Sequence, residues 1–205
     1  MIKIGITMRV VEAQGYREPR DALAQDWTDF MAVAFPECLW MPVPNVGNRV
    51  VEYVRAWDLD AFIFSGGNDL GSSPRRDQTE QALLKYAVEN RLPVFGVCRG
   101  LQLLHQYYGG ALEPCDAGVH VAAQHDVDLN GETYRVNSYH NFGIRETAVS
   151  PALTVIARTG DGWVEGVDLT DAPGRAVMWH PERDRPYRKR DIQLMRECLL
   201  EGVPS

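Results

Sequence analysis

Apolar and polar positions follow each other in the first half of the chain in a pattern that predicts strands separated by helices. Four short apolar runs have the length and composition of buried strands, at residues 2–7, 39–44, 61–64 and 92–97. Apolar side chains at helical spacing, or glycines that end a segment, predict four helices between and after these strands. They lie at residues 21–35, 46–57, 76–90 and 98–110. In the third of these helices, Asp77 and Glu80 are spaced as a capping box. Strands joined by crossover helices predict an α/β fold with a mostly parallel central sheet flanked by helices.

The second half of the chain is richer in strands. Five are predicted, at residues 120–129, 132–138, 153–159, 163–168 and 175–180. Turn residues at 130–131, 160–162 and 173–174 separate these strands and predict hairpins, so extra antiparallel strands should extend the sheet. A last helix is predicted near 192–202, and we find no linker, so residues 1–205 are predicted to form a single domain.

Composition narrows the possible functions. The 205 residues are 45% hydrophobic and 24% charged, which is typical of a folded protein. The net charge of -7 argues against nucleic acid as a general partner. No apolar run approaches a membrane span and the first residues resemble a core strand, so a cytoplasmic location is predicted. The four cysteines show no paired spacing, which favours reduced thiols over disulfides.

The segment VFGVCRGLQLL places Cys98 between Gly96 and Gly100, where an apolar strand passes into a helix. Such a turn needs small residues on both sides of a nucleophile, because the flanking backbones approach too closely for side chains. The helix dipole favours a thiolate at this position, and the N–H of Arg99 is placed to stabilise an oxyanion. A core cysteine at the end of a strand remains the alternative interpretation of this segment.

The segment RAVMWHPER supplies a base and an orienting group for such a thiol. His180 and Glu182 lie two positions apart at the predicted end of a strand, where their side chains would share one face. Pro181 suits a strand terminus because it lacks an N–H. The two glycines at 66–67 close another strand at the same sheet edge and allow backbone amides to approach a ligand. The alternative for His180 and Glu182 is a surface histidine beside a glutamate. The alternative for the two glycines is an ordinary turn.

Four motifs in this order, SGGNDL, GVCRGLQLL, VNSYHNFGI and MWHPER, resemble the class I glutamine amidotransferase-like superfamily. Within it the chain is most similar to the peptidase C26-like group of γ-glutamyl-γ-aminobutyrate hydrolases. The resemblance implies a triad of Cys98, His180 and Glu182, with oxyanion donors at the backbones of Gly67 and Arg99. It also implies a γ-glutamyl pocket formed by Gly66, Asn68, Gln102, Ser138, Tyr139 and His140.

This resemblance implies a hydrolase that cleaves a γ-glutamyl amide through a thioester on Cys98, acting on a small molecule without a cofactor. A glutaminase subunit that delivers ammonia to a partner synthase is the alternative. A binding protein on an inactive scaffold would lack one of the triad residues, and all three are present. Cys115, His120, His125 and His140 follow no common zinc spacing and fall across a predicted hairpin, so no metal site is predicted.

A long loop at residues 8–21 follows the first strand and carries Arg9, Arg17 and Arg20. A cationic loop at this sheet edge suits an anionic leaving group. The early segment also resembles a subgroup that hydrolyses γ-glutamyl-CDP-amidate during synthesis of capsule phosphoramidate, which implies a nucleotide-phosphate leaving group. Surface salt bridges from these arginines to the nearby acidic residues Glu12, Glu18 and Asp21 are an equally simple interpretation.

Overall fold

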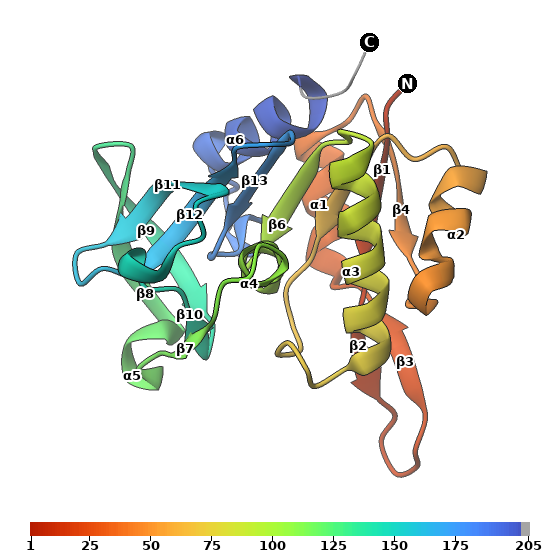
Figure 1. Ribbon diagram of the computed structural model, residues 1–205, viewed down its shortest axis with the longest axis horizontal. Helices are drawn as coiled ribbons and strands as arrows, with labels where there is room; N and C mark the ends of the chain where they lie inside the picture. Colours follow the sequence, from red (N-terminus) through yellow and green to blue (C-terminus); the bar gives the residue numbers. More distant parts are fainter. Residues whose placement is uncertain (202–205) are drawn as a thin grey trace.

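A computed structural model describes residues 1–201 and contains one large mixed sheet (Figure 1). Its nine strands are ordered β4-β1-β5-β6-β13-β12-β11-β8-β9. The parallel part consists of β4 (Leu39–Val43), β1 (Lys3–Thr7), β5 (Ala61–Phe64), β6 (Val94–Val97) and β13 (Gly174–Val177). The antiparallel part continues with β12 (Val164–Leu169), β11 (Leu153–Thr159), β8 (Val121–Leu129) and β9 (Glu132–Tyr139). The predicted parallel core with added antiparallel strands is therefore confirmed.

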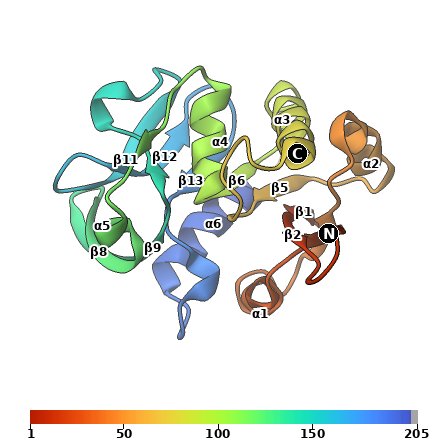
Figure 2. The ribbon, with the colours of Figure 1, turned by 90° about the horizontal axis from the view of Figure 1, so that it is seen from below.

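Helices cover both faces of the parallel strands (Figure 2). One face carries α1 (Gln25–Ala34) and α6 (Lys189–Glu201), and the other carries α2 (Val50–Ala56), α3 (Pro74–Glu89) and α4 (Arg99–Tyr107). Every residue of β5 and β6 is buried, as expected for parallel strands that are covered on both sides. No helix within residues 1–201 combines the length and apolar character needed to cross a membrane.

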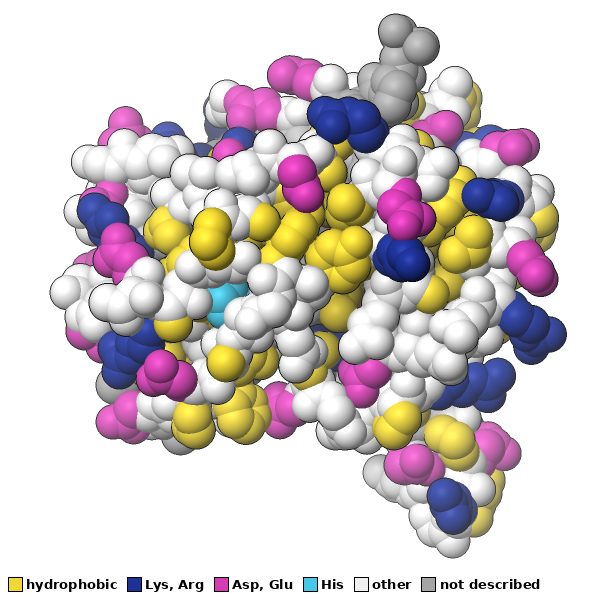
Figure 3. All heavy atoms as spheres, in the orientation of Figure 1, with side chains coloured by type: hydrophobic (Ala, Val, Ile, Leu, Met, Phe, Trp, Pro, Cys, Tyr) yellow, Lys and Arg dark blue, Asp and Glu magenta, His cyan; other side chains and the backbone are white. Residues whose placement is uncertain are grey.

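The segment after β1 differs from the predicted loop. It forms a two-stranded hairpin from β2 (Arg9–Glu12) and β3 (Pro19–Ala22), which projects from the molecule (Figures 1 and 3). The carboxyl ends of the parallel strands lie on the side from which this hairpin projects. It therefore stands where ligands bind in folds of this kind.

Short elements complete the chain. They are the 3-10 helices η1 (Gly47–Arg49), η2 (Glu146–Ala148) and η3 (Pro181–Arg183), the helix α5 (Ala117–His120), and the paired strands β7 (Glu113–Pro114) and β10 (Phe142–Gly143). Two of these elements lie next to histidines: η3 directly follows His180, and α5 ends at His120.

The predicted capping box is wrong. Helix α3 begins at Pro74, so Asp77 and Glu80 lie inside the helix, and Ser73 is the N-cap residue. Both carboxylates instead pair with the guanidinium of Arg99 on α4. A spacing that suggested local helix capping in fact serves a long-range contact between α3 and α4.

Candidate active site

Cys98 occupies a strained turn between β6 and α4. Its φ of 52° and ψ of -99° lie outside the regions that ordinary side chains favour. Its backbone N–H donates to the carbonyl of Val177 on β13, at 2.8 Å, which holds the turn against the sheet. A strained, fixed turn at the carboxyl end of a strand is the geometry expected of a nucleophile elbow.

The two glycines around Cys98 are required by close backbone packing. A Cβ atom on Gly96 would lie 2.7 Å from the carbonyl carbon of Gly100. A Cβ atom on Gly100 would lie 2.5 Å from the carbonyl oxygen of Phe64 on the neighbouring strand. Real side chains essentially never approach backbone atoms this closely, so only glycine fits at either position.

His180 and Glu182 form a buried pair. Nδ1 of His180 lies 2.7 Å from Oε1 of Glu182, and each side chain is about 2% exposed. Burial favours the neutral imidazole, but the carboxylate of Glu182 and the adjacent Cys98 outweigh it and raise the pKa of His180 to about 9. The imidazole is therefore protonated at neutral pH.

The local structure around His180 differs from the prediction. Strand β13 ends at Val177, and His180 precedes the 3-10 helix η3 instead of lying in a strand. The carboxylate therefore reaches the imidazole through a tight turn and not because two strand residues share a face. The contact itself is as predicted.

Gly66 shows how close the cysteine and the histidine lie. A Cβ atom added to Gly66 would be 2.5 Å from Cε1 of His180 and 3.5 Å from Cβ of Cys98. Gly66 thus borders both His180 and Cys98. The loop after β5 needs glycine here because the imidazole occupies the space that a side chain would take.

Asn137 on β9 was not predicted as a site residue. Its Nδ2 donates to the carbonyl of His180 at 2.9 Å, and its Oδ1 accepts from the backbone N–H of His180 at 2.9 Å. Asn137 is 4% exposed, so these bonds are shielded from water. The side chain therefore fixes both backbone groups of the histidine.

Arg76 on α3 holds the loop after β5. Its NH2 donates to the carbonyl of Ser65 at 2.7 Å and to that of Gly66 at 3.2 Å, and its NH1 donates to the carbonyl of Gly67. In a trans peptide the C=O and N–H groups point in opposite directions. Holding the Gly66 carbonyl therefore turns the N–H of Gly67 away from Arg76 and α3.

A buried charge network supports Arg76. Glu80 pairs with it at 2.9 Å and also pairs with Arg99. Arg99 contacts Asp77 as well. Burial lowers the pKa of Arg76 to about 10, and burial together with the nearby charge of Arg76 lowers the pKa of Arg99 to about 9, so both remain charged at neutral pH. The network ties the glycine loop to the first turn of α4.

The residues of the predicted γ-glutamyl pocket are only partly assembled around the cysteine. Gln102 donates through Nε2 to the carbonyl of Phe142 at 2.8 Å, one turn along α4. The ring of Tyr139 lies 5.6 Å from that of His180, and the guanidinium of Arg183 stacks on it. The hydroxyl of Ser138 donates to the carbonyl of His120 at 2.6 Å, so it serves the neighbouring backbone.

His140 takes part in a different cluster from the triad residues. Its Nδ1 lies 3.1 Å from the carbonyl oxygen of Phe142, and its Nε2 lies 3.4 Å from Oε1 of Glu165 on β12. The ring of His140 also lies 4.9 Å from that of His120. The side chain of His140 therefore contacts the same Phe142 carbonyl as Gln102 does.

The hairpin is anchored to the glycine loop by Asn68, whose φ is 56°. Its Oδ1 accepts from the N–H of Val10 at 2.7 Å, and its Nδ2 donates to the carbonyl of Val10 at 3.0 Å. Arg9 of the same strand lies against Gly67, where an added Cβ atom would be 3.4 Å from its Nε. The hairpin thus begins directly beside the glycine loop.

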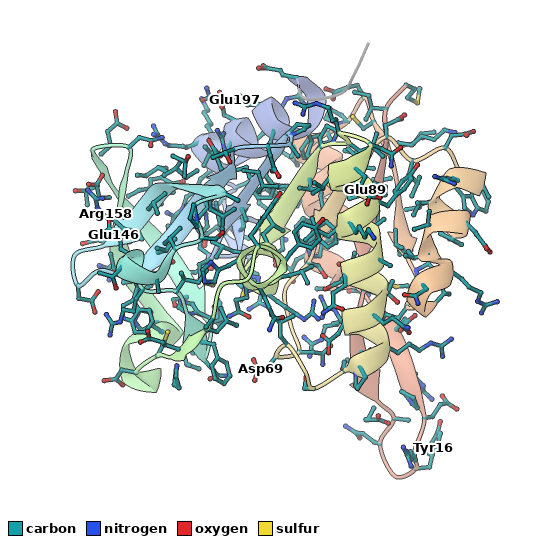
Figure 4. All side chains as sticks on the ribbon, viewed as in Figure 1. Tyr16, Asp69, Glu89, Glu146, Arg158 and Glu197 are labelled. Atoms are coloured by element: carbon teal, nitrogen blue, oxygen red, sulfur yellow. The ribbon has the colours of Figure 1, made fainter. Side chains whose placement is uncertain are left out.

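The three arginines of the hairpin have different surroundings. Arg9 lines a small cavity together with Gly66 and His180. Arg17 lines a larger cavity of about 510 Å³ between the hairpin and the start of α3. Arg20 instead bonds Glu18 at 2.5 Å and the hydroxyl of Tyr16 at 2.6 Å, at the hairpin tip where Figure 4 labels Tyr16. For Arg20, the surface salt bridge is the arrangement observed.

The fold is that of the glutamine amidotransferase-like class. A glutamine amidotransferase of Thermotoga maritima shares the fold, with a TM-score of 0.62 at 12% identity over 98% of this chain and 90% of that one. The family model of peptidase C26 matches residues 3–182. The chain therefore belongs to the peptidase C26 family.

Two relatives have names that specify a reaction. The γ-glutamyl-CDP-amidate hydrolase of Campylobacter jejuni is 29% identical over 201 residues, which cover 95% of this chain and 96% of that protein. The γ-glutamyl-γ-aminobutyrate hydrolase of Escherichia coli O157:H7 is 33% identical over 144 residues, which cover 57% of this chain and 56% of that protein. Both of these relatives are thus named as γ-glutamyl hydrolases, which act on C–N bonds.

Proposed function

We propose that this chain is a cysteine hydrolase that cleaves a γ-glutamyl amide bond with Cys98, His180 and Glu182 as its catalytic residues. The observation that carries the proposal is the position of the His180 ring, which bonds Glu182 on one side and lies beside the strained Cys98 on the other. A nucleophile, a base and a group that orients the base are the parts required for acyl transfer.

The first half of the reaction is attack on the amide. The Cys98 thiolate adds to the γ-carbonyl carbon, and the carbonyl electron pair moves to the oxygen. When the tetrahedral intermediate collapses, the C–N bond breaks and the imidazolium of His180 gives its proton to the departing amine. The raised pKa of His180 supports this role, because the proton is present on the imidazole at neutral pH.

The second half is hydrolysis of the γ-glutamyl thioester. The now neutral His180 takes a proton from water, the hydroxide adds to the thioester carbon, and the C–S bond breaks to release glutamate. Glu182 holds the imidazole in place through Nδ1. No step in this sequence requires a cofactor.

The backbone N–H groups of Gly67 and Arg99 are the proposed oxyanion donors. Arg99 is the first residue of α4, where N–H groups have no partner within the helix. The grip of Arg76 on successive carbonyls of the glycine loop supports a fixed orientation for the N–H of Gly67. Gly66, Asn68 and Gln102 are the residues that we propose help to hold the γ-glutamyl group.

For the leaving group we propose a nucleotide phosphoramidate such as CDP-amidate. The cavity of about 510 Å³ is lined by Arg17 and Arg75 as well as by Glu12 and Asp21, and it lies at the N-terminus of α3 beside Ser72 and Ser73. Arginine forks and helix N-termini both favour phosphate groups. Arg9, the first residue of the hairpin, lies against Gly67 of the glycine loop. The near full-length match to a γ-glutamyl-CDP-amidate hydrolase supports the same substrate.

The test is glutamate release from glutamine, γ-glutamyl-γ-aminobutyrate and γ-glutamyl-CDP-amidate. We expect γ-glutamyl-CDP-amidate to be preferred and its turnover to be lost in Cys98→Ala but kept in Cys198→Ala. Mass spectrometry of quenched wild-type protein should detect a γ-glutamyl adduct on Cys98. Turnover of glutamine alone, or only with an added synthase, would favour a glutaminase subunit. Full activity in Cys98→Ala would overturn the covalent mechanism.

The leaving-group assignment has its own test. Arg17→Ala and Arg75→Ala should each raise KM for γ-glutamyl-CDP-amidate about tenfold while leaving KM for γ-glutamyl-γ-aminobutyrate unchanged, because only the first carries phosphates. Arg158→Ala is a matched control, since that arginine lies on β11 in an exposed ion pair with Glu146 (both labelled in Figure 4). Equal KM changes for both substrates would remove these arginines from phosphate recognition.

A further inference from the structure

Three of the five histidines of the chain gather around one buried carboxylate, outside the triad. They are His120 at the end of α5, His125 on β8 and His140 after β9, and the carboxylate is Glu165 on β12. The ring of His120 lies 5.2 Å from that of His125 and 4.9 Å from that of His140. His120, His140 and Glu165 are at most 2% exposed.

The spacing of the ligand atoms suits a metal ion. His120, His125 and Glu165 each offer one ligand atom, and these three atoms lie within 4.8 Å of one another. Nε2 of His125 and Nε2 of His140 each lie 3.4 Å from a different oxygen of Glu165. Ligand atoms around a tetrahedral zinc ion, with bonds of about 2 Å, are separated by about 3.4 Å. Each distance from Glu165 to a histidine is thus that of two ligands on one ion, and a second group of ligand atoms within 4.8 Å of one another joins His120 and His140 to Cys115.

Two members of this cluster, His120 and Glu165, have buried polar atoms that the protein alone does not satisfy. Within residues 1–201, Nδ1 of His120 and both oxygens of Glu165 are buried without a hydrogen bond of normal geometry. A fully buried carboxylate that relies on two histidine contacts of 3.4 Å is costly to desolvate. An ion pair between Glu165 and its two neighbouring histidines would explain why the carboxylate is buried. It would not explain why Nδ1 of His120 is buried without a hydrogen bond.

The surroundings orient the candidate ligands. Nδ1 of His140 bonds the carbonyl of Phe142 at 3.1 Å, which leaves Nε2 directed at Glu165. The carbonyl of His120 accepts from the hydroxyl of Ser138 and from the N–H of His140, which fixes its backbone. Metal-binding histidines are oriented in the same way, with the second ring nitrogen donated to a carbonyl or carboxylate.

We propose that His120, His125, His140 and Glu165 form a structural binding site for a single divalent transition-metal ion of the zinc class. Chain spacing predicted no metal site, because the carboxylate comes from a distant strand and only folding brings it to the histidines. Three imidazoles and one carboxylate are a donor set that zinc favours. The ion would join α5, β8, the end of β9 and β12. Its site adjoins Phe142, whose carbonyl also accepts the hydrogen bond from Gln102.

The test is metal content, which does not depend on the proposed hydrolase reaction. Wild-type protein produced with zinc and dialysed exhaustively should retain one zinc ion per chain by elemental mass spectrometry. Glu165→Gln should lower that content at least tenfold. His105→Gln is the matched control, because His105 is also buried but bonds the carbonyl of Ala111 on a different part of the chain. Cys98→Ala should also retain the ion, which separates this site from the catalytic thiol.

A second measurement covers variants that fail to fold. Chelator-treated wild-type protein should show a rise in Tm when zinc is added, whereas folded Glu165→Gln should not. Cobalt in place of zinc should give the absorption of a four-coordinate ion without a thiolate charge-transfer band. This band is informative because Sγ of Cys115 lies 3.7 Å from Nδ1 of His140. A thiolate band lost in Cys115→Ser would overturn this ligand set. Zinc content equal in wild type and Glu165→Gln, or no retained zinc and no Tm change in wild type, would overturn the site.

Discussion

Asn137 holds both backbone groups of His180, donating to its carbonyl at 2.9 Å and accepting from its N–H at 2.9 Å. The two residues come from β9 and from the turn before η3, so this contact joins the antiparallel and parallel parts of the sheet at His180. Asn137 also donates to Asp184 at 3.0 Å, just beyond that turn. A single buried amide thus fixes the segment that carries both His180 and Glu182.

We expect Asn137→Ala to lower kcat for the γ-glutamyl substrate by about a hundredfold, because a misplaced base loses its alignment with the nucleophile. The free energy of unfolding should fall by about 1–3 kcal/mol, since two backbone groups lose buried partners. Steady-state kinetics and urea denaturation measure the two effects. Asn137→Asp keeps the acceptor but loses the donor, so its kcat should lie between those of wild type and Asn137→Ala.

The matched control is Asn48→Ala, because Asn48 is exposed on η1 far along the chain from this contact. It should leave both kcat and stability unchanged. If Asn137→Ala lost stability but kept full kcat when folded, the amide would be a structural contact only and not a positioning residue for His180.

Gly66→Ala tests how tightly the site is packed. The added Cβ would lie 2.5 Å from the His180 ring, so the imidazole must move and kcat should fall at least a hundredfold. Gly160→Ala adds the same methyl group in the turn between β11 and β12, where nothing lies within 4 Å, and should behave as wild type. Kinetics together with circular dichroism distinguish the outcomes. A folded, fully active Gly66→Ala would mean that turnover does not require the imidazole to stay in the position it occupies beside Gly66.

Arg76→Lys tests the support of the glycine loop. A lysine keeps the charge beside Glu80 but cannot reach three successive carbonyls with a planar fork, so the N–H of Gly67 should lose its fixed direction. We expect kcat to fall about tenfold to a hundredfold with little change in KM. Arg55→Lys on the exposed side of α2 is the control and should have no effect. A rise in KM at constant kcat would assign Arg76 to substrate binding instead.

Some elements could be predicted from sequence because their apolar runs are fully buried. Strands such as β5 and β6 consist entirely of core residues, so their composition alone identifies them. The β2–β3 hairpin has only exposed or half-buried residues and contains Pro19, so it carries no such signal. It forms because Asn68 binds the backbone of Val10 at both polar groups, a contact across the fold that no local pattern shows.

The same distinction applies to the sites. Cys98 could be singled out from sequence because its glycine neighbours are a local requirement of the turn. Asn137 and Arg76 act through contacts made only after folding, and Glu165 meets its histidines from a separate strand. Arg76 in particular carries no local signal, since it is only the first residue of a predicted helix. Its burial at the start of α3 gives it its role.

The raised pKa of His180 predicts how stability depends on pH. In the unfolded chain a histidine titrates near about 6.5, whereas in the folded protein His180 titrates at about 9. The folded state therefore binds the proton more tightly, and the resulting stabilisation is complete below pH ~6.5 and is lost as pH rises through about 9. Glu182→Gln removes the carboxylate that favours the charged imidazole.

We therefore expect wild type to exceed Glu182→Gln in free energy of unfolding by up to ~3 kcal/mol at pH 6, with the difference shrinking steadily toward pH 10. Urea denaturation of both proteins at several pH values measures it. Glu197→Gln, at a partly exposed position on α6 labelled in Figure 4, is the control and should show no such trend between pH 6 and 10. A difference that is constant across this range would mean that His180 does not change protonation there, and the imidazolium would lose its support as the acid that protonates the leaving amine.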